Sequence, residues 1–596
     1  MTGPSIGAPA STPGFAALRA ERAVETRLVD GTPQAGVWDT ATGERRVLTR
    51  GPHGVDFSEI EPDGGHVWWF DADAGGIGLW QREAFGGGPG RAALSGVPLG
   101  LPRGIGFSRL GELCAICVGD AELSRCFLGS PGQFGREFYA VAGYRCLIDI
   151  SPNGDLLALA GLPDGPDALV LLDISDGDVV ATVGGGRDGR LWALEFHPDH
   201  RRDPELLLMA ETATGFVVAT WSRAAGLEYR SHLTFPTTAS ARWYPDGSGA
   251  AGRRVLIQQE IAGRSRLLVA DLDEPGFREL PIPDGTVHDL SCAPDGSVYY
   301  LWGRADTPAT LLRVDAEPQL PEAIREADAS AQVRDLWTAT DYGEIHSFLT
   351  SPPTQPPWPT IFLIHGGPAA HDRDLADSRV DALRDAGYAV VRTNYRGSTG
   401  YGPQWQHGFG QRVGLAQIED LAAVRAHLVA EGLADERRTV AYGYSWGGYL
   451  ALLALGVQPE LWSAGIAVQP IADYVATFAT TTPTLRAVDV GLFGGTPEEF
   501  PERYAAASPI THVDRVRGPV LLIAATADDR CPPEQIERYA QALRDRGVPH
   551  RVLWRDGGHV NRHAEEQAAI VAAALGFLRE QRDVPFQLLG ATASRP

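Results

Sequence analysis

A serine at the centre of a G-x-S-x-G pentapeptide is the clearest sign of chemistry in this sequence. Residues 443–447 read Gly-Tyr-Ser-Trp-Gly, with Ser445 at the centre. They follow an apolar run that ends near Tyr442 and precede a helical stretch over 447–457, which is the strand–turn–helix context that this motif requires. The glycines permit a sharp turn that holds the serine hydroxyl clear of a sheet. The sequence therefore predicts that Ser445 is a nucleophile.

An acid and a base for that serine occur further along the chain, in the order Ser, Asp, His. The apolar run 520–525 is followed by the adjacent acids Asp528 and Asp529, and either could serve. The next apolar run, 551–554, leads into a glycine loop that contains His559, the predicted base. In such a triad the histidine takes the proton from the serine, while the aspartate orients the ring and stabilises the imidazolium.

A tetrahedral intermediate also needs fixed hydrogen-bond donors for its oxyanion. A His-Gly-Gly-Pro segment at 365–368 follows the apolar run 360–364, and such a segment commonly supplies a backbone N–H. The backbone N–H of Trp446, next after the nucleophile, is the second predicted donor. Nucleophile, acid, base and donors together predict acyl transfer through a covalent acyl-enzyme.

Strands and helices alternate in the part of the chain that holds these residues, from about residue 333 onward. Such alternation predicts a mostly parallel sheet wrapped by helices, and with the motifs above it predicts an α/β-hydrolase domain over 333–596. The apolar runs are 360–364, 388–391, 439–442, 464–468, 520–523 and 551–554, and the helical stretches lie around 372–386, 413–431, 447–457, 533–546 and 562–580.

The first half of the chain repeats instead. Turns of the type Pro-Asp/Asn-Gly recur about every 47 residues, each followed by short apolar strands, which is typical of a β-propeller. The turns begin at Pro62, Pro152, Pro245 and Pro294, with variants at Arg109 and Pro198. We predict an N-terminal extension over 1–23, a propeller over 24–316 and a linker over 317–332. Seven blades are favoured, although six or eight also fit the repeat.

Composition excludes several classes of function. The chain has 596 residues, with 52 basic against 75 acidic side chains and a net charge of -23, a field that repels nucleic acid and anionic membranes. No apolar run is long enough to span a bilayer, and the first residues lack a signal sequence, so we expect a cytoplasmic protein. No metal-ligand cluster, phosphate loop or dinucleotide fingerprint occurs, and we expect no cofactor and no metal.

These motifs resemble those of the prolyl oligopeptidase family of serine peptidases, which combine a β-propeller with a hydrolase domain. The resemblance covers essentially the whole chain, although the propeller part is architectural. The matching segments are H-G-G-P at 365–368, N-Y-R-G-S-T-G-Y-G at 394–402, G-Y-S-W-G-G-Y at 443–449, A-D-D-R at 527–530 and G-G-H at 557–559. The first two look most like the acylaminoacyl-peptidase branch.

The resemblance assigns further roles. It implies that Asp528, rather than Asp529, is the triad acid, and that Arg530 binds a substrate carbonyl beyond the scissile bond. The N–H of Gly367 is implied as an oxyanion donor, ahead of the hydroxyl of Tyr401, which matches a donor in some members.

The resemblance also suggests where the substrate side chain binds. The segment 468–478, with Val468 and Phe478 at its ends, and Phe493 are expected to line that pocket, although core packing would explain their apolar character equally well. Cys531 departs from the family, which usually has an aliphatic residue there.

Three functions fit these observations. The first is a serine peptidase that cleaves short peptides or N-blocked aminoacyl bonds, with the propeller limiting substrate size. The second is an esterase or amidase of a small metabolite that uses the same triad. The third, a non-catalytic interaction protein, is disfavoured by the complete triad. A dipeptidyl specificity is also disfavoured, because residues 24–330 contain no Glu-Glu pair. Expected partners are short peptides or small amides and esters, without nucleic acid or membrane, in a possible homo-oligomer.

Overall fold

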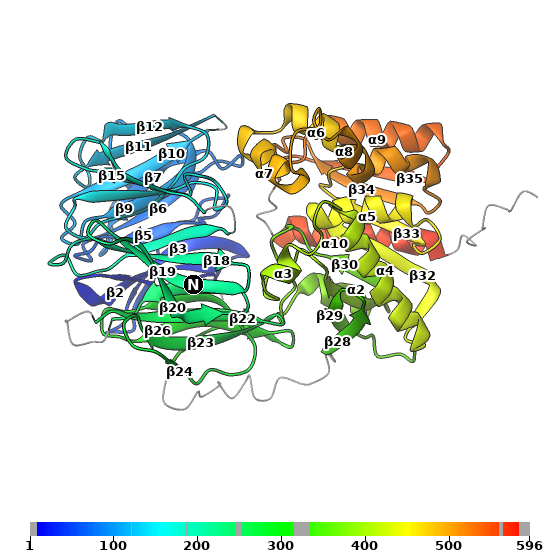
Figure 1. Ribbon diagram of the computed structural model, residues 1–596, viewed down its shortest axis with the longest axis horizontal. Coiled ribbons are helices and arrows are strands. Elements are labelled where there is room, and N and C mark those ends of the chain that lie inside the picture. The colour runs from blue at the N-terminus through cyan, green and yellow to red at the C-terminus, as the bar shows by residue number, and fades with distance from the viewer. Residues whose placement is uncertain are drawn as a thin grey trace, which may run out of the picture. The chain divides into compact units, whose positions relative to one another are not determined.

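Seven small antiparallel sheets follow one another along the first part of the chain and form a β-propeller (Figure 1). The computed structural model describes residues 9–120, 122–185, 189–245, 252–314, 333–559 and 564–582. Within these residues six sheets have four strands and the last has three. The predicted count of seven blades is confirmed. The predicted linker, 317–332, lies outside the described residues.

Each blade takes its strands in chain order. Blades 1 to 4 contain β1–β4 (Gly14–Ala16, Arg19–Val29, Thr32–Asp39, Arg45–Val47), β5–β8 (Ser58–Ile60, His66–Ala72, Gly78–Ala84, Arg91–Ala92), β9–β12 (Leu101–Phe107, Cys114–Gly119, Leu123–Gly129, Arg136–Ala142) and β13–β16 (Cys146–Ile150, Leu156–Ala160, Leu169–Asp173, Val179–Val183). Blades 5 to 7 contain β17–β20 (Leu191–Phe196, Glu205–Thr212, Gly215–Ser222, Gly226–Phe235), β21–β24 (Ala239–Trp243, Arg254–Ile261, Arg264–Asp271, Phe277–Glu279) and β25–β27 (Thr286–Cys292, Val298–Arg304, Thr307–Arg313). Strand β1 already begins before residue 24, where the sequence predicted the propeller to start.

The repeated turns connect the first and second strands of a blade. In the turn between β13 and β14, the N–H of Gly154 donates to Ser151 O at 2.8 Å, and Gly154 has a φ of 80°. The turn between β25 and β26 is built alike, with Gly296 at a φ of 88°. A positive φ favours glycine, which explains why the turn sequence recurs with the blade period.

Carboxylates on the first strands hold neighbouring blades together. Asp149 accepts a hydrogen bond from the N–H of Phe196 in the next blade at 3.0 Å, and Glu195 accepts one from the N–H of Trp243 at 2.6 Å. Asp289 of blade 7 accepts from both the N–H and the hydroxyl of Thr12, each at 2.8 Å. This last contact joins the end of the ring to its beginning.

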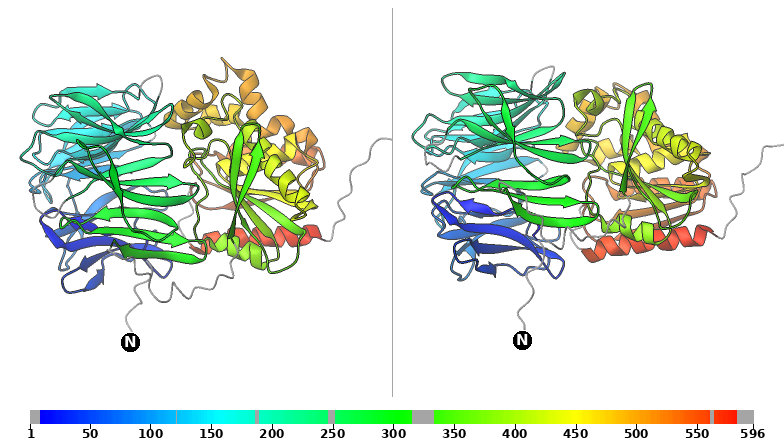
Figure 2. Two further views of the ribbon diagram at one scale, coloured as in Figure 1. Left: turned by 60° about the horizontal axis from the view of Figure 1, so that its bottom comes forward. Right: turned by 90° about the horizontal axis from the view of Figure 1, so that it is seen from below.

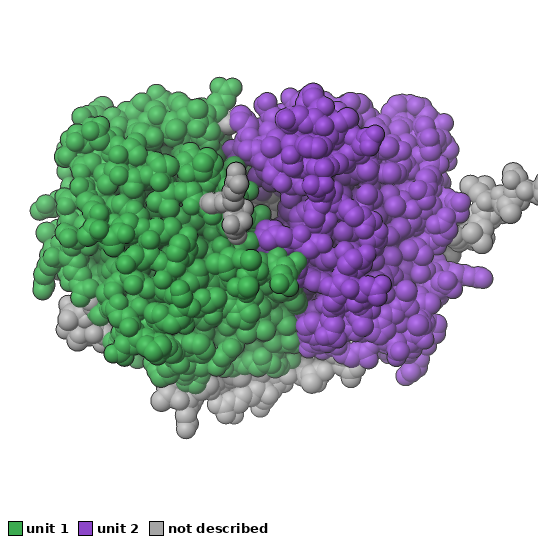
Figure 3. Space-filling model, in the orientation of Figure 1, with its two compact units in different colours: residues 1–326, 400–404 green, residues 327–399, 405–596 purple. Residues whose placement is uncertain are grey.

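The chain folds into two compact units (Figure 3). One contains residues 1–326 and 400–404, and the other contains 327–399 and 405–596. The second unit is an eight-stranded sheet in the order β28-β29-β31-β30-β32-β33-β34-β35. Its bounds are β28 Val333–Thr340, β29 Gly343–Thr350, β30 Trp358–Ile364, β31 Ala389–Asn394, β32 Ala434–Tyr444, β33 Ala464–Val468, β34 Val520–Ala525 and β35 His550–Arg555.

The sheet is antiparallel over β28, β29 and β31 and parallel from β31 onward. Helices α2 (Ser378–Asp385) and α10 (Ala564–Arg582) pack on one face. Helices α4 (Leu415–Ala430), α5 (Trp446–Val457) and α9 (Pro533–Asp545) pack on the other (Figures 1 and 2). This is the predicted α/β-hydrolase architecture.

Several helices were not among those that the sequence pattern predicted. Between β33 and β34 the chain forms α6 (Tyr474–Thr480), α7 (Pro483–Phe493), α8 (Pro501–Ala507) and the 3-10 helix η1 (Pro509–Arg515), and the short α3 (Pro403–Gln406) lies earlier. Apart from α7, each of these helices has at most seven residues, too few for a clear apolar period. In α7 only Asp489 and Phe493 are buried, so a hydrophobic face is hard to recognise from the sequence.

Candidate active site

Ser445 lies in a tight turn between β32 and α5, in the middle of the parallel sheet. Its φ of 55° and ψ of -119° are rare for a residue with a side chain. The flanking glycines allow this turn. A Cβ on Gly443 would lie 2.1 Å from the carbonyl carbon of Gly447, and a Cβ on Gly447 would lie 2.0 Å from Ile364 O. The spacing of the G-x-S-x-G motif therefore follows from sterics.

Ser445, His559 and Asp528 are joined by hydrogen bonds. His559 Nε2 lies 2.9 Å from Ser445 Oγ, and His559 Nδ1 lies 2.8 Å from Asp528 Oδ2 and 3.0 Å from Oδ1. Asp528 and His559 are buried, whereas Asp529 is exposed. Of the two adjacent acids, the structure brings Asp528 to the histidine. The arrangement allows a proton to pass from the serine hydroxyl to the imidazole while the carboxylate holds the other ring nitrogen.

Asp528 is held from several sides. Its Oδ1 accepts the backbone N–H groups of Arg530 at 3.0 Å and Cys531 at 2.8 Å. Its Oδ2 accepts from Gln469 Nε2 at 3.1 Å. With His559 as a further donor, hydrogen bonds satisfy the buried carboxylate and fix its plane.

Gln469 is a site residue that the sequence analysis missed. It is buried, has a φ of 47°, and its amide also donates to Gly558 O at 3.0 Å. The hydroxyl of Tyr444, adjacent to the nucleophile, donates to Gln469 Oε1 and contacts the carbonyl oxygen of His559. The one signal in the sequence is that Gln469 directly follows the apolar run of β33, since sites in parallel sheets form at the carboxyl ends of the strands.

The His-Gly-Gly-Pro segment passes beside the nucleophile. A Cβ on Gly366 would lie 3.6 Å from Ser445 Cβ. Gly367 has a φ of 144°, and a Cβ there would approach Ala369 N to 2.9 Å, so this position requires glycine. The N–H of Trp446 belongs to the first residue of α5, where helical N–H groups have no intrahelical acceptor.

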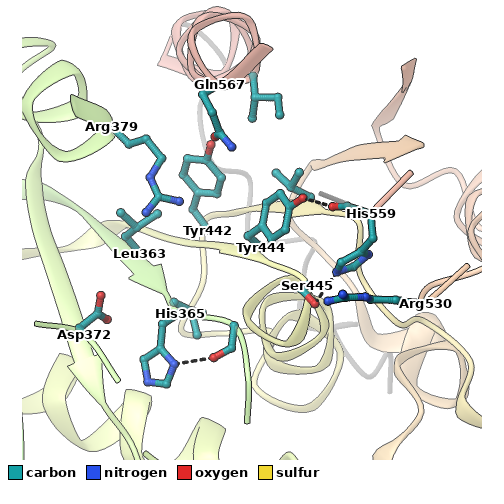
Figure 4. Close-up of a pocket in the computed structure, with 14 residues that line it drawn as sticks. Leu363, His365, Asp372, Arg379, Tyr442, Tyr444, Ser445, Arg530, His559 and Gln567 are labelled. Carbon is teal, nitrogen blue, oxygen red and sulfur yellow. Dashed lines mark hydrogen bonds between the residues drawn. The ribbon is translucent and has the colours of Figure 1, made fainter. Parts of the chain in front are cut away.

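His365 fixes the orientation of the peptide group that follows it. Its Nδ1 lies 2.7 Å from Gly366 O (Figure 4), and its Nε2 lies 3.0 Å from Ser398 Oγ. The ring stacks on Tyr395 with a centroid distance of 4.2 Å. Burial lowers the pKa of His365, which favours a neutral ring that donates from Nδ1 and accepts at Nε2. Because the bonded carbonyl and the next N–H point in opposite directions, the N–H of Gly367 points away from the His365 ring.

A cavity of about 420 Å³ opens beside these residues (Figure 4). Of the predicted binding residues, Arg530 and Val468 line it together with Ser445 and His559. It extends toward Asp372 in the loop before α2, Arg379 on α2 and Gln567 on α10. The sequence analysis had not singled out these last three.

Phe478 and Phe493 lie in a separate aromatic cluster. Phe493 is fully buried and stacks on Tyr504 at a centroid distance of 4.0 Å, and Phe478 meets Tyr504 edge-on at 5.9 Å. Tyr474 links this cluster to the residue after the nucleophile, with ring centroids 5.1 Å from Phe493 and 6.5 Å from Trp446.

Tyr401 lies in the segment 400–404, which groups with the propeller unit. It is half-buried, and its role as an oxyanion donor stays a prediction.

Over the described residues, one group of side chains is close enough to share a metal ion, namely Asp528, Cys531 and His559, with donor atoms within 4.8 Å of one another. Two of these residues already bond to each other through the atoms that a metal would need. No helix in the described parts of the chain is long and apolar enough to cross a membrane.

Comparisons with known proteins show what the second half of the chain is similar to. The sequence model of the Prolyl oligopeptidase family matches residues 375–584. The acylamino-acid-releasing enzyme of Mus musculus is 33% identical over 201 residues, which cover 33% of this chain and 27% of that enzyme. The dipeptidyl peptidase family member 6 of Caenorhabditis elegans is 25% identical over 357 residues, covering 52% of this chain and 47% of that protein. The matched region thus spans about a quarter to a half of these relatives' lengths.

Solved structures share both parts of the fold. The acylaminoacyl peptidase of Pyrococcus horikoshii gives a TM-score of 0.76 at 17% identity and covers 96% of this chain and 95% of its own. A puromycin-hydrolyzing peptidase of Mycobacterium tuberculosis gives a TM-score of 0.76 at 21% identity and covers 96% of this chain and 97% of its own. The predicted resemblance to the family, and to its acylaminoacyl-peptidase branch, is confirmed.

Proposed function

We propose that this chain, whose residues 375–584 belong to the prolyl oligopeptidase family, is a serine peptidase that cleaves short peptides or N-blocked aminoacyl bonds. The observation that carries the proposal is the hydrogen-bonded series Ser445 Oγ, His559 and Asp528 in one loop cluster at the carboxyl end of the sheet. A serine so placed beside a buried imidazole has the geometry of an acyl-enzyme nucleophile.

In the proposed mechanism, Ser445 Oγ attacks the scissile carbonyl as His559 Nε2 takes its proton. The N–H groups of Gly367 and Trp446 bind the oxygen on which negative charge develops. His559 then gives the proton to the departing amine, and Asp528 stabilises the imidazolium between these steps. A water molecule repeats the sequence on the acyl-enzyme and releases the acid.

Two residues of the cavity are proposed to hold the peptide. Arg530 lines the cavity beside Ser445, and its guanidinium is proposed to donate to a substrate carbonyl. Val468 lines the same cavity and supplies apolar contact. Phe478 and Phe493 are proposed to line the pocket for the substrate side chain, as part of the aromatic cluster that reaches Trp446.

The propeller is proposed to restrict the size of substrates. The proposal is supported by its seven blades and by the similarity of peptidase structures over 96% of this chain. Turnover per bond on a tetrapeptide should exceed turnover on an unfolded protein of about 100 residues, since only the short chain would pass a restricted entrance. Equal rates would contradict size selection.

A second candidate is an amidase or esterase of a small metabolite. A puromycin-hydrolyzing peptidase shares this fold, and a triad determines acyl transfer without determining the acyl group. A panel of N-acetyl-aminoacyl, free aminoacyl and blocked Gly-Pro anilides, with a simple ester, separates the two. Cleavage of the ester alone would favour the second candidate.

The nucleophile is tested with Ser445→Ala. This variant should fold normally and lose amidase activity by several orders of magnitude, because the triad acts as a unit. A fluorophosphonate probe should label the wild type at one serine and leave Ser445→Ala unlabelled. Labelling of the variant would contradict the assignment.

A further inference from the structure

A buried carboxylate without a partner lies in the aromatic cluster beside the triad. Asp489 is on α7 and is 8% exposed. No side chain or backbone group within the described residues donates a hydrogen bond to it or pairs with it as an ion. Burying an ionised carboxylate without a partner costs free energy, and a bound cation would offset that cost.

The cations of the surrounding helices bind elsewhere. Arg486 Nε donates to Thr481 O at 3.3 Å, and Arg503 Nη1 donates to Phe493 O at 2.8 Å. The chain contains no lysine at all. The described residues therefore supply no cation to Asp489, and a ligand could supply one.

The surroundings of Asp489 suit a cation. Electrostatic interaction with Asp489 helps to raise the pKa of Tyr449, Tyr474 and Tyr504, for each of which burial is the larger cause. The hydroxyl of Tyr474 is buried and lacks a hydrogen-bond partner in the described part of the chain. Aromatic faces together with a carboxylate and a spare hydroxyl are a known environment for ammonium and guanidinium groups.

Asp489 lies one helical turn from Phe493, the other buried residue of α7, so its side chain faces the cluster in which the Phe493 and Tyr474 rings lie 5.1 Å apart. The thiol of Cys531, whose N–H holds the triad acid, has its pKa raised by burial first, then by Asp528, and also by Asp489. The ring of Tyr474 adjoins that of Trp446, whose N–H is a proposed oxyanion donor. Because the oxyanion forms on the acyl carbonyl, a group near Trp446 lies beside the acyl residue of the substrate.

We propose that Asp489 binds a positively charged group on the acyl residue of the substrate. That group is either the protonated side chain of a basic residue or a free α-amino group. The inference rests on acyl transfer at Ser445 and adds a substrate class to it, namely cationic acyl residues. It also modifies the expectation of a purely apolar pocket around Phe478 and Phe493.

The test uses two matched pairs of p-nitroanilides. N-acetyl-lysine and N-acetyl-norleucine anilides differ by the side-chain ammonium group, and free norleucine and N-acetyl-norleucine anilides differ by the α-amino group. The wild type should prefer the cationic member of one pair by about 100-fold in kcat/KM, and that pair identifies the source of the charge. Asp489→Asn should remove the preference, whereas Glu498→Gln, which changes an exposed acid after α7, should keep it.

The outcomes separate this inference from the proposed function. Cleavage of anilides without preference for a cation, or a preference that survives Asp489→Asn, overturns the inference and leaves the peptidase proposal intact. If only esters are cleaved, the peptidase proposal fails, and the same pairs made as p-nitrophenyl esters decide the role of Asp489. No hydrolysis of either series overturns both. A lower unfolding midpoint for Asp489→Asn would identify a structural residue and also overturn the inference.

Discussion

Two buried carboxylates of the same domain, Asp528 and Asp489, differ in what surrounds them. Asp528 is 4% exposed and accepts hydrogen bonds from two backbone N–H groups, from Gln469 and from His559. Asp489 is 8% exposed and accepts none from the described residues. The two carboxylates are therefore similarly buried, but hydrogen bonds stabilise only the negative charge of Asp528. Hydrogen bonds fix Asp528 in the position that orients its neighbour His559. Asp489 has no such partners and is available to a ligand.

The propeller supports this distinction. Its carboxylates Asp149 and Glu195 each accept an N–H from the next blade, and their role there is to hold the ring together. Burial raises the pKa of Asp149 to about 7, as it does for Asp489. A raised pKa is thus common to a structural and an unpartnered carboxylate, and the hydrogen bonds distinguish them.

The largest effect is expected from the bonded carboxylate. Asp528→Asn should lower kcat by about 10⁴-fold, because an amide at this position favours the wrong tautomer of His559. Asp529→Asn is the matched control and should have a much milder effect, since Asp529 is exposed. Steady-state kinetics on one blocked anilide decide between them. The reverse ranking would show that the wrong acid has been assigned.

A smaller loss is expected when one of the bonds to Asp528 is removed. Gln469→Leu should reduce kcat by about 10-fold to 100-fold with little change in KM, because Gln469 acts through the carboxylate and does not contact substrate. Gln469→Glu keeps the shape but places a second acid beside Asp528. Its pH–rate profile should shift to higher pH, since a neighbouring negative charge favours protonated His559. An unchanged profile together with unchanged kcat would mean that Gln469 only packs.

The unpartnered carboxylate should make selectivity depend on pH. Burial raises the pKa of Asp489 to about 7. The titratable groups that interact with it electrostatically all have raised pKa values and are neutral at that pH, namely Tyr449, Tyr474, Tyr504 and Cys531. A cation binds the ionised form, so the preference for the cationic substrate should fall as the pH drops below about 7. The test is the ratio of the two kcat/KM values for the pair that shows the preference, measured from about pH 5.5 to about pH 8.5. Below about pH 7 this ratio should fall by up to about 10-fold per pH unit. A constant ratio would contradict the assignment.

The smallest expected effect is on stability. The pKa of Asp489 is raised in the folded state, so the folded protein loses stability as the pH rises from the usual carboxyl range to about 7. Asp489→Asn lacks this loss, and its unfolding midpoint should exceed that of the wild type by a few degrees above pH 7 and by less near pH 4. Thermal unfolding at the two pH values measures the difference. An advantage that is larger at low pH would contradict the sign.

Much of the fold and of the triad could be predicted from the sequence. The repeated turn has a glycine at a positive φ in four of the blades, at Gly64, Gly111, Gly154 and Gly296, and this recurrence predicted the propeller. The close contacts of Gly443 and Gly447 explain why the nucleophile turn has a recognisable motif. In each case sterics favour glycine, in the blade turns and at Gly443 through the backbone of a few neighbouring residues.

Other features were decided by tertiary structure alone. The residues alone left Asp528 and Asp529 as alternatives, and which of them meets His559 depends on how two loops from adjacent strands come together. Gln469 and Asp489 belong to no sequence motif that marks a site. Their roles depend on groups that are distant in the chain. Gln469 acts through Asp528, which is 59 residues further on. Asp489 lies among aromatic rings from three other helices, and no cation in the described residues pairs with it. Local sterics leave a mark in the sequence, whereas the partners of a buried charge are fixed only when the chain has folded.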